Sequence, residues 1–118
     1  MSSLSFEEAQ KLVDNWISKF EEGYFPPLVQ LARLIEELGE LSRAVSHQTG
    51  VKIPKQNENT HSVEEEFGDL LFLMTCFANA QNISMSNAFT KTLNKIEARD
   101  TSRWTLKKDF NHDQNEET

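Results

Sequence analysis

The sequence contains a single cysteine, Cys76, which excludes an internal disulfide bond and is typical of a protein from a reducing compartment. Basic residues are also few, because 12 Lys and Arg stand against 19 Asp and Glu, a formal net charge of −7. Nucleic-acid binding needs clustered Lys and Arg that neutralise phosphates, so this charge argues against it. No apolar run is long enough to span a bilayer, and the N-terminus has no signal-peptide pattern. We therefore expect a soluble, cytoplasmic protein.

Several catalytic motifs are missing as well: there is no Gly-rich phosphate loop, no Gly-x-Ser-x-Gly and no Cys-x-x-Cys. What is present is a chain of 118 residues that is 37% hydrophobic, with eight Phe and two Trp. This size and composition indicate one globular domain with a single core. Its acidic residues form the only arrangement with recognisable chemistry.

Apolar residues recur at helical spacing through most of the chain, which predicts an all-α fold resembling a four-helix bundle. Two capping boxes mark helix starts, one made by Ser5 and Glu8 and the other by Ser62 and Glu65. The predicted domain is residues 1–104, with helices at about 5–22, 27–47, 62–81 and 84–100, a flexible loop at 48–61, and a disordered, polar acidic tail at 105–118.

The third predicted helix is apolar almost all the way round after Asp69, from Leu70 to Ala78. A helix of this kind is buried on most sides. A monomer of 118 residues has too little remaining chain to cover it. We therefore expect a homo-oligomer, either a dimer or a tetramer.

Two acidic motifs stand out, because Glu36-Glu37-Leu38-Gly39-Glu40 is nearly repeated 29 positions later as Glu65-Glu66-Phe67-Gly68-Asp69. Residues three apart lie about 60° apart on the same side of a helix. Two such helices facing each other would bring four carboxylates together, and these repel one another unless a cation lies between them. We expect this cation to be Mg²⁺, which prefers oxygen ligands.

Each motif has a glycine between its acids, Gly39 and Gly68. Glycine costs about 1 kcal/mol relative to alanine inside a helix, so we expect another helix or a ligand to approach closely there. Matched glycines are hard to explain by the alternative, two solvated Glu-rich helix faces. Glu58 and His61 have the Glu-x-x-His spacing of di-iron proteins, but this motif occurs once and in a loop, so we expect no metal role.

Four carboxylates could hold two Mg²⁺ ions, a pair that can activate water and stabilise a leaving phosphate oxygen. Glu36 lies beside the cluster but out of line with it, where it could orient or deprotonate the water. The fourth predicted helix carries a basic strip, from which Lys95 and Arg99 are available for the phosphate charge.

The two-part acidic motif resembles the signature of the MazG-like nucleotide pyrophosphohydrolases, all-α enzymes related to dimeric dUTPases, and most resembles their small stand-alone bacterial members. The likeness covers roughly residues 6–104 and includes Tyr24-Phe25-x-Pro27-Leu28 and Asn79. It implies hydrolysis of a nucleoside triphosphate, or its deoxy form, to the monophosphate and pyrophosphate. The implied cofactor is Mg²⁺, with Mn²⁺ as a substitute.

The resemblance also implies roles for individual residues. The implied metal ligands are Glu37, Glu40, Glu66 and Asp69, with Glu36 beside them and Lys95 and Arg99 near the phosphates as catalytic and substrate-binding residues. Many family members have Asn directly after that Lys, where this chain has Ile96 and instead has Asn94 before it. Further expected substrate contacts are Asn79, Asn94 and Trp16, with Phe20 and Tyr24 as other candidates for a base pocket.

Three functions remain open at this point. The first is a nucleotide pyrophosphohydrolase that removes non-standard nucleotides from the pool. The second is a phosphoribosyl-ATP pyrophosphohydrolase, which shares the fold and the use of carboxylate-bound metal ions. The third is a non-enzymatic helical oligomerisation module with a structural divalent-ion site.

Overall fold

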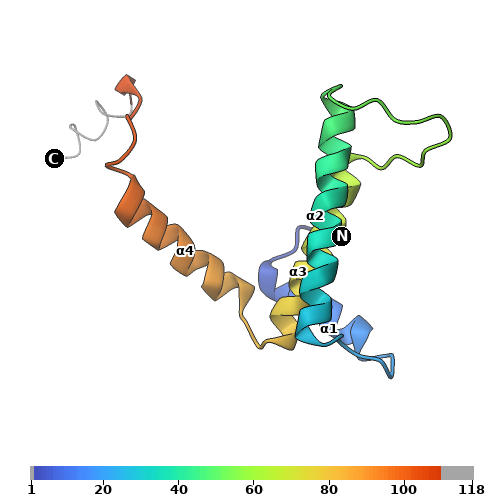
Figure 1. Cartoon of the computed structure of the whole chain (residues 1–118). Coiled ribbons are helices and arrows are strands. Elements are labelled where there is room, and N and C mark those ends of the chain that lie inside the picture. The colour runs from blue at the N-terminus through green and yellow to red at the C-terminus, as the bar shows by residue number, and fades with distance from the viewer. Residues whose placement is uncertain (1, 110–118) are drawn as a thin grey trace. The chain divides into compact units, whose positions relative to one another are not determined.

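The computed structural model describes residues 2–109, and within this range it contains four helices and no strand (Figure 1). The all-α prediction is therefore confirmed. Among these residues, no helix combines the length and the hydropathy required to cross a bilayer. The four helices are α1 (Phe6–Ile17), α2 (Pro27–Gln48), α3 (Val63–Ala80) and α4 (Met85–Asp100).

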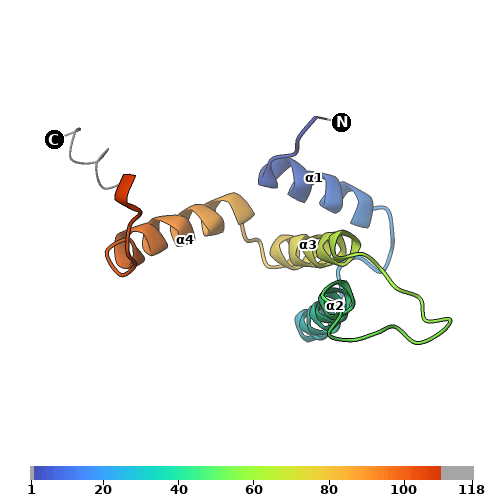
Figure 2. The same ribbon diagram turned by 90° about the horizontal axis from the view of Figure 1, so that it is seen from above.

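The chain divides into two compact units, Met1–Ser86 and Asn87–Thr118. In the first unit, α3 packs against both α1 and α2, as Figure 2 shows. Helices α2 and α3 run in opposite directions, because the start of one lies beside the end of the other (Figure 1). This arrangement places the middle of α2, with the first acidic motif, beside the early turns of α3, with the second. The predicted single domain at 1–104 stays a prediction.

Helix α1 begins as the sequence predicts, with a complete capping box between Ser5 and Glu8. It ends at Ile17, five residues before the predicted boundary at 22. The Ser18 hydroxyl donates to the carbonyl of Asp14 at 2.7 Å, and the chain then turns until Gly23, whose φ of 60° is left-handed. Glycine adopts that conformation without a steric cost, so the chain can reverse toward α2 there.

Helix α2 begins with Pro27 in its first turn, a position where the missing N–H of proline is harmless. Helix α3 begins behind Ser62, whose hydroxyl accepts from the Glu65 N–H at 3.0 Å. In the predicted capping box the Glu65 carboxylate would accept a hydrogen bond from the backbone N–H of Ser62. It instead contacts His61 Nδ1 at 3.2 Å. The connection between the two helices has no regular secondary structure.

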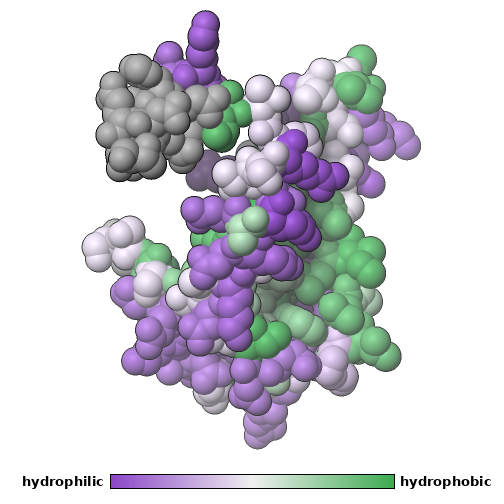
Figure 3. Space-filling view, turned by 90° about the vertical axis from the view of Figure 1, so that its left-hand side faces the viewer, coloured by the Kyte–Doolittle hydropathy of each residue, from purple (hydrophilic) through white to green (hydrophobic). Residues whose placement is uncertain are grey.

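Little of this chain is fully covered: the only buried apolar residues in the described part are Ala44, Cys76 and Ala78. Large apolar side chains remain exposed, including Ile35 at 71% and Phe67 at 53%, and Figure 3 shows such side chains gathered in broad patches. Helix α3 was expected to be buried on most sides, yet within one chain it is not. An exposed apolar surface of this kind is typical of an interaction site.

In the second unit, no residue of α4 is buried. Its expected inner face includes Phe89, Leu93 and Ile96, which are each 44% exposed or more. The predicted tail begins here, and residues 105–109 are exposed apart from the half-buried Leu106. The remainder of that predicted tail, residues 110–118, lies outside the described residues.

Candidate functional site

Three carboxylates from the two acidic motifs meet between α2 and α3. Glu37 on α2 and Glu66 and Asp69 on α3 each offer an oxygen, and these oxygens all lie within 4.8 Å of one another. We call these residues the acidic trio. Glu66 is buried at 4% exposure, Glu37 is half-buried and Asp69 is exposed. The antiparallel packing of the helices therefore brings together residues that are 29 and 32 positions apart.

Burial and the neighbouring carboxylates both act on the pKa of Glu37. Burial raises the pKa of this carboxyl, and the charges of Asp69, Glu66 and Glu40 raise it further, against a lowering by Arg33. None of the ion pairs formed by the described residues involves a member of the trio. The donor set is three carboxylates. Mg²⁺ prefers oxygen ligands of this type, so the residues fit a divalent ion.

The other two predicted acidic site residues lie beside the trio. Glu40 follows Glu37 by one turn and is exposed; it lines a narrow hollow together with Glu66 and Arg43. Its charge nevertheless reaches Glu37 and raises the pKa there. Glu36 is exposed on α2 and is not part of the trio. The roles of Glu40 as a metal ligand and Glu36 as a base stay predictions.

The two glycines of the motifs face open space. A Cβ atom added at Gly39 or Gly68 would meet no atom within 4 Å apart from its own helix neighbourhood. No other helix of the described residues therefore approaches closely at these glycines. A ligand or a second chain remains compatible with the open space on this side.

A cavity of about 260 Å³ lies between α1, α2, α3 and the turn that joins α1 to α2. We call it the aromatic pocket. Its lining begins one turn from the trio, because Phe72 follows Asp69 by three residues and Arg33 precedes Glu37 by four. Its lining includes Trp16, Tyr24, Phe25, Gln30, Arg33 and Phe72.

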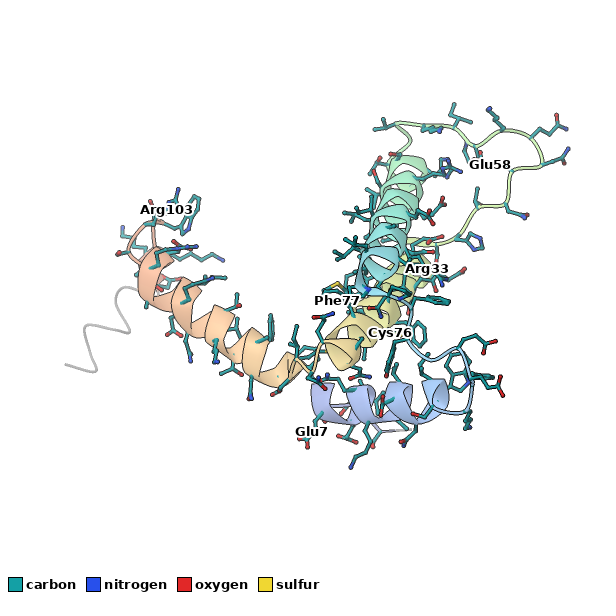
Figure 4. The ribbon with its side chains drawn as sticks, turned by 60° about the horizontal axis from the view of Figure 1, so that its bottom comes forward. Glu7, Arg33, Glu58, Cys76, Phe77 and Arg103 are labelled. Carbon is teal, nitrogen blue, oxygen red and sulfur yellow. The ribbon has the colours of Figure 1, made fainter. Side chains whose placement is uncertain are left out.

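Aromatic side chains hold the walls of this pocket in edge-to-face contacts. The Trp16 ring lies 5.0 Å from Phe20 and 6.1 Å from Phe72, measured between centroids. The Arg33 guanidinium lies 5.1 Å above the Phe25 ring, which is within the range of a cation–π interaction. Figure 4 shows Arg33 on α2 and Cys76 on α3, two further residues that line the pocket. Of the residues expected to contact the substrate or form a base pocket, Trp16 and Tyr24 line it.

Asn79 and Tyr24 are engaged in a hydrogen-bond network that ties α1 to α3. The Asn79 amide donates to the Gln10 carbonyl and to the Tyr24 hydroxyl, both at 3.0 Å, and accepts from Gln10 Nε2. The Tyr24 hydroxyl in turn donates to Asp14 Oδ1 at 2.7 Å. Burial and this hydrogen bond raise the pKa of Tyr24 to about 12. A substrate contact by Asn79 stays a prediction.

Gln10 is a residue whose role the sequence did not indicate. Besides its contacts with Asn79, its side chain donates to the Ile83 carbonyl at 2.8 Å and accepts from the Met85 N–H at 2.9 Å. It therefore connects α1 to the end of α3 and to the start of α4. A single polar residue at the edge of an amphipathic helix gives no pattern from which such a role could be read.

A polar hollow of about 450 Å³ lies beyond the acidic trio, toward the end of α2, and His47 and His61 line it. The smaller hollow next to Glu40 and Glu66 is lined by the same two histidines and Arg43. Arg43 contacts Glu58 at 3.5 Å, and the hydrogen bond to Glu65 raises the pKa of His61. These basic side chains were missed from the sequence. Arg43 and His47 follow Glu40 by three and seven residues, a helical spacing that could have indicated them.

The remaining predicted site residues belong to the second unit. Lys95 is exposed on α4, and Asn94 lines a shallow hollow with Glu97 and Thr101. Arg99 donates two hydrogen bonds of 2.9 Å to the carboxylate oxygens of Asp100, which raises the pKa of the guanidinium. The roles of Lys95, Arg99 and Asn94 toward a substrate stay predictions.

Comparison with known proteins adds an independent observation. Residues 25–104 match the family described as the MazG nucleotide pyrophosphohydrolase domain. The YpjD protein of Bacillus subtilis (strain 168) is 46% identical over 109 residues, which is 92% of this chain and 98% of that protein.

Two solved structures are similar as well. The crystal structure of YpjD from Bacillus subtilis has a TM-score of 0.71 at 46% identity, covering 80% of this chain and 97% of its own. A second structure, described as the Bacillus-conserved MazG protein, a nucleotide pyrophosphohydrolase, has a TM-score of 0.72 at 43% identity. It covers 86% of this chain and 99% of its own.

Proposed function

Because the chain belongs to the MazG nucleotide pyrophosphohydrolase family, and is thus a hydrolase acting on pyrophosphate bonds, we propose that it converts nucleoside triphosphates or their deoxy forms to monophosphates and pyrophosphate with Mg²⁺. The observation that carries this proposal is the acidic trio next to the aromatic pocket. A metal-binding group beside an apolar, ring-lined cavity fits a ligand with a charged end and a flat end. A nucleotide is such a ligand. Family membership also decides against the non-enzymatic module.

In this proposal Glu37, Glu66 and Asp69 hold the metal, and Glu40 joins them from the next turn of α2. A bound Mg²⁺ supplies charge neutralisation for the phosphate oxygens and lowers the pKa of bound water, and Mn²⁺ is the expected substitute. Glu36 accepts a proton from the attacking water, since it is a carboxylate next to the trio that is not needed as a ligand. Lys95 and Arg99 donate to phosphate oxygens, as the family resemblance implies.

The aromatic pocket receives the base in this scheme. Its rings offer flat apolar surfaces against which a base can stack. Trp16 provides one of these surfaces. Removal of non-standard nucleotides in the cytoplasm, where nucleoside triphosphates and Mg²⁺ are both present, is the physiological role that we propose.

The decisive experiment incubates the protein with a panel of nucleoside triphosphates, their deoxy forms and phosphoribosyl-ATP, with Mg²⁺ or with EDTA. We expect pyrophosphate and a monophosphate as first products, and no turnover in EDTA. Turnover of phosphoribosyl-ATP alone would favour the second enzymatic alternative. Orthophosphate as the first product would contradict the assigned bond.

Variants assayed with the same substrates test which carboxylates bind the metal and which one acts on the water. Asp69→Asn and Glu40→Gln should abolish pyrophosphate release and the rise in melting temperature on adding Mg²⁺, whereas Glu36→Gln should keep that rise and lower turnover. The matched control is Glu64→Gln, an exposed carboxylate of α3 outside the trio, which should retain activity. A loss of metal response in Glu36→Gln equal to that in Glu40→Gln would make Glu36 a ligand instead of a base.

A further inference from the structure

Gln30 is the most deeply buried polar side chain of the aromatic pocket. It is 7% exposed, lies at the end of the first turn of α2 and lines the cavity together with the α3 residues Phe72 and Cys76. Its Oε1 atom is buried and accepts no hydrogen bond from any described residue. A buried carbonyl oxygen left without a donor destabilises a folded protein, so its presence requires an explanation.

A purely structural role does not explain this amide. Apart from Arg33, the lining is mostly apolar or aromatic, as at Trp16, Phe25 and Phe72, and a leucine or methionine would pack against these walls. Replacing an unpaired buried polar group with an apolar one of similar size is neutral or stabilising. The amide therefore makes the empty pocket less stable than an apolar side chain would, and it gains a partner only from something that enters.

The position of Gln30 defines which part of a ligand it would meet. It precedes Glu37 by seven residues, which is two helical turns or about 10 Å along α2. The acidic trio would hold phosphates through a metal at one end of this span, so the group that reaches Gln30 belongs to the far end of the ligand. The volume of about 260 Å³ is near the lower limit for small-molecule pockets and suits a single flat ring system.

We propose that Gln30 is the specificity-determining residue of this pocket and recognises the edge of a nucleobase, an inference that rests on the proposed nucleotide substrate. A carboxamide presents an acceptor and a donor side by side, and most nucleobases present the complementary pair on one edge. The base stacks on the aromatic walls, its edge pairs with the Gln30 amide, and the buried oxygen obtains its missing donor. Arg33, the other polar lining residue near Gln30 on α2, offers donors only.

The first test measures kcat/KM for the four deoxynucleoside triphosphates with the wild-type protein and with Gln30→Leu. We expect the wild type to prefer some bases. Gln30→Leu should lower kcat/KM about 10-fold or more for the preferred base and less for the others, so that the kcat/KM values for the four substrates become similar. Gln30→Met, which keeps an unbranched side chain, serves if the leucine variant folds poorly. Gln48→Leu is the matched control, being the same substitution at the exposed end of α2, and should keep the wild-type preference.

The second test is independent of turnover. Deoxynucleoside monophosphates are titrated in EDTA while the fluorescence of Trp16 is followed, in a Trp104→Phe background so that a single tryptophan reports. Gln30→Leu should lose the base preference of this binding, and its melting temperature without nucleotide should equal or exceed that of the wild type.

The outcomes separate the two hypotheses. Hydrolysis with a base preference that is unchanged in Gln30→Leu and Gln30→Met would overturn the role of Gln30 and leave the proposed function standing. A fall in melting temperature without nucleotide, with base preference intact, would give Gln30 a structural role. Failure to hydrolyse any nucleotide would overturn the proposed function, and monophosphate binding that depends on Gln30 would still support base recognition.

Discussion

Polar side chains in apolar surroundings are the most informative single residues of this protein. Glu66 is 4% exposed and forms no ion pair with a described residue, and Gln30 is 7% exposed with an unpaired oxygen. Each destabilises the chain unless a ligand compensates for it, a cation for Glu66 and a hydrogen-bond donor for Gln30. Tyr24 is the contrasting case, since its hydroxyl is fully used by Asp14 and Asn79.

Tyr24→Phe is expected to lower the free energy of unfolding by about 1 kcal/mol at neutral pH, because it removes the hydrogen bond to Asp14. The pKa of Tyr24 in the folded protein is raised from 10.0 to about 12. The stabilisation from the neutral hydroxyl is therefore fully present below pH 10 and is lost as the pH rises from about 10 to about 12. The difference between wild type and variant should shrink over that interval in denaturant titrations.

The same titration can be followed directly. The chain has one tyrosine, so the ultraviolet absorbance of tyrosinate reports Tyr24 alone. A midpoint near pH 10 in the folded protein would contradict both the burial of the hydroxyl and its bond to Asp14.

At the scale of helices, the register between α2 and α3 decides the chemistry. Their antiparallel packing places Glu37 beside Glu66 and Asp69, and it places Gln30 beside the residues that follow Asp69 by one and two turns. The acidic trio and the aromatic pocket therefore follow one another along the same pair of helices. A Cβ atom added at the glycine of either acidic motif would meet no atom of the described residues within 4 Å, its own helix neighbourhood aside.

Gly68→Ala is expected to raise the free energy of unfolding of metal-free protein by up to about 1 kcal/mol, because alanine has the higher helix propensity and its Cβ meets no atom within 4 Å. Thermal or denaturant unfolding in EDTA measures this. Gly39→Ala on α2 is the matched variant and should behave alike. Destabilisation by either alanine would indicate that a second chain contacts the helix at that glycine.

At the scale of the whole molecule, the exposed apolar surface is the dominant feature. No large side chain of the described residues is fully buried. Apolar residues of the helices are at least 46% exposed at Ile35 on α2 and at Leu71 and Met74 on α3. Burial of apolar area contributes about 25 cal/mol per Å², and a chain that leaves this surface in water forgoes much of its stability. We therefore retain the prediction of a homo-oligomer.

Ile35→Glu is expected to dissociate this oligomer, because a charge would be placed where an apolar contact is predicted. Size-exclusion chromatography with light scattering should give the mass of a dimer or tetramer for the wild type and a lower mass for the variant. Val51→Glu, at an 83% exposed position in the connection between α2 and α3, is the control and should keep the wild-type mass. A wild-type protein of 13.6 kDa in solution would contradict the prediction.

Much of the candidate site could be predicted from residues that act locally. Glu37, Glu66 and Asp69 were identified because two near-identical motifs repeat on helices, and the structure brings them together. Glu40 was assigned the same role by its spacing from Glu37; it lines a hollow with Glu66 but lies outside the trio, and its role as a ligand stays a prediction. Gln10 and Gln30 could not be predicted, since an isolated glutamine carries no periodic or motif signal.

By itself the sequence determined the four helices, the start of α1 at its capping box, and the pair of acidic motifs, because helical periodicity and capping depend on neighbours within a few residues. The meeting of Glu37 with Glu66 and Asp69 and the burial of Gln30 were decided only by the tertiary structure. Each of these depends on the distance between atoms of different turns or helices. That distance follows from how the helices pack and in which register, which no local pattern encodes.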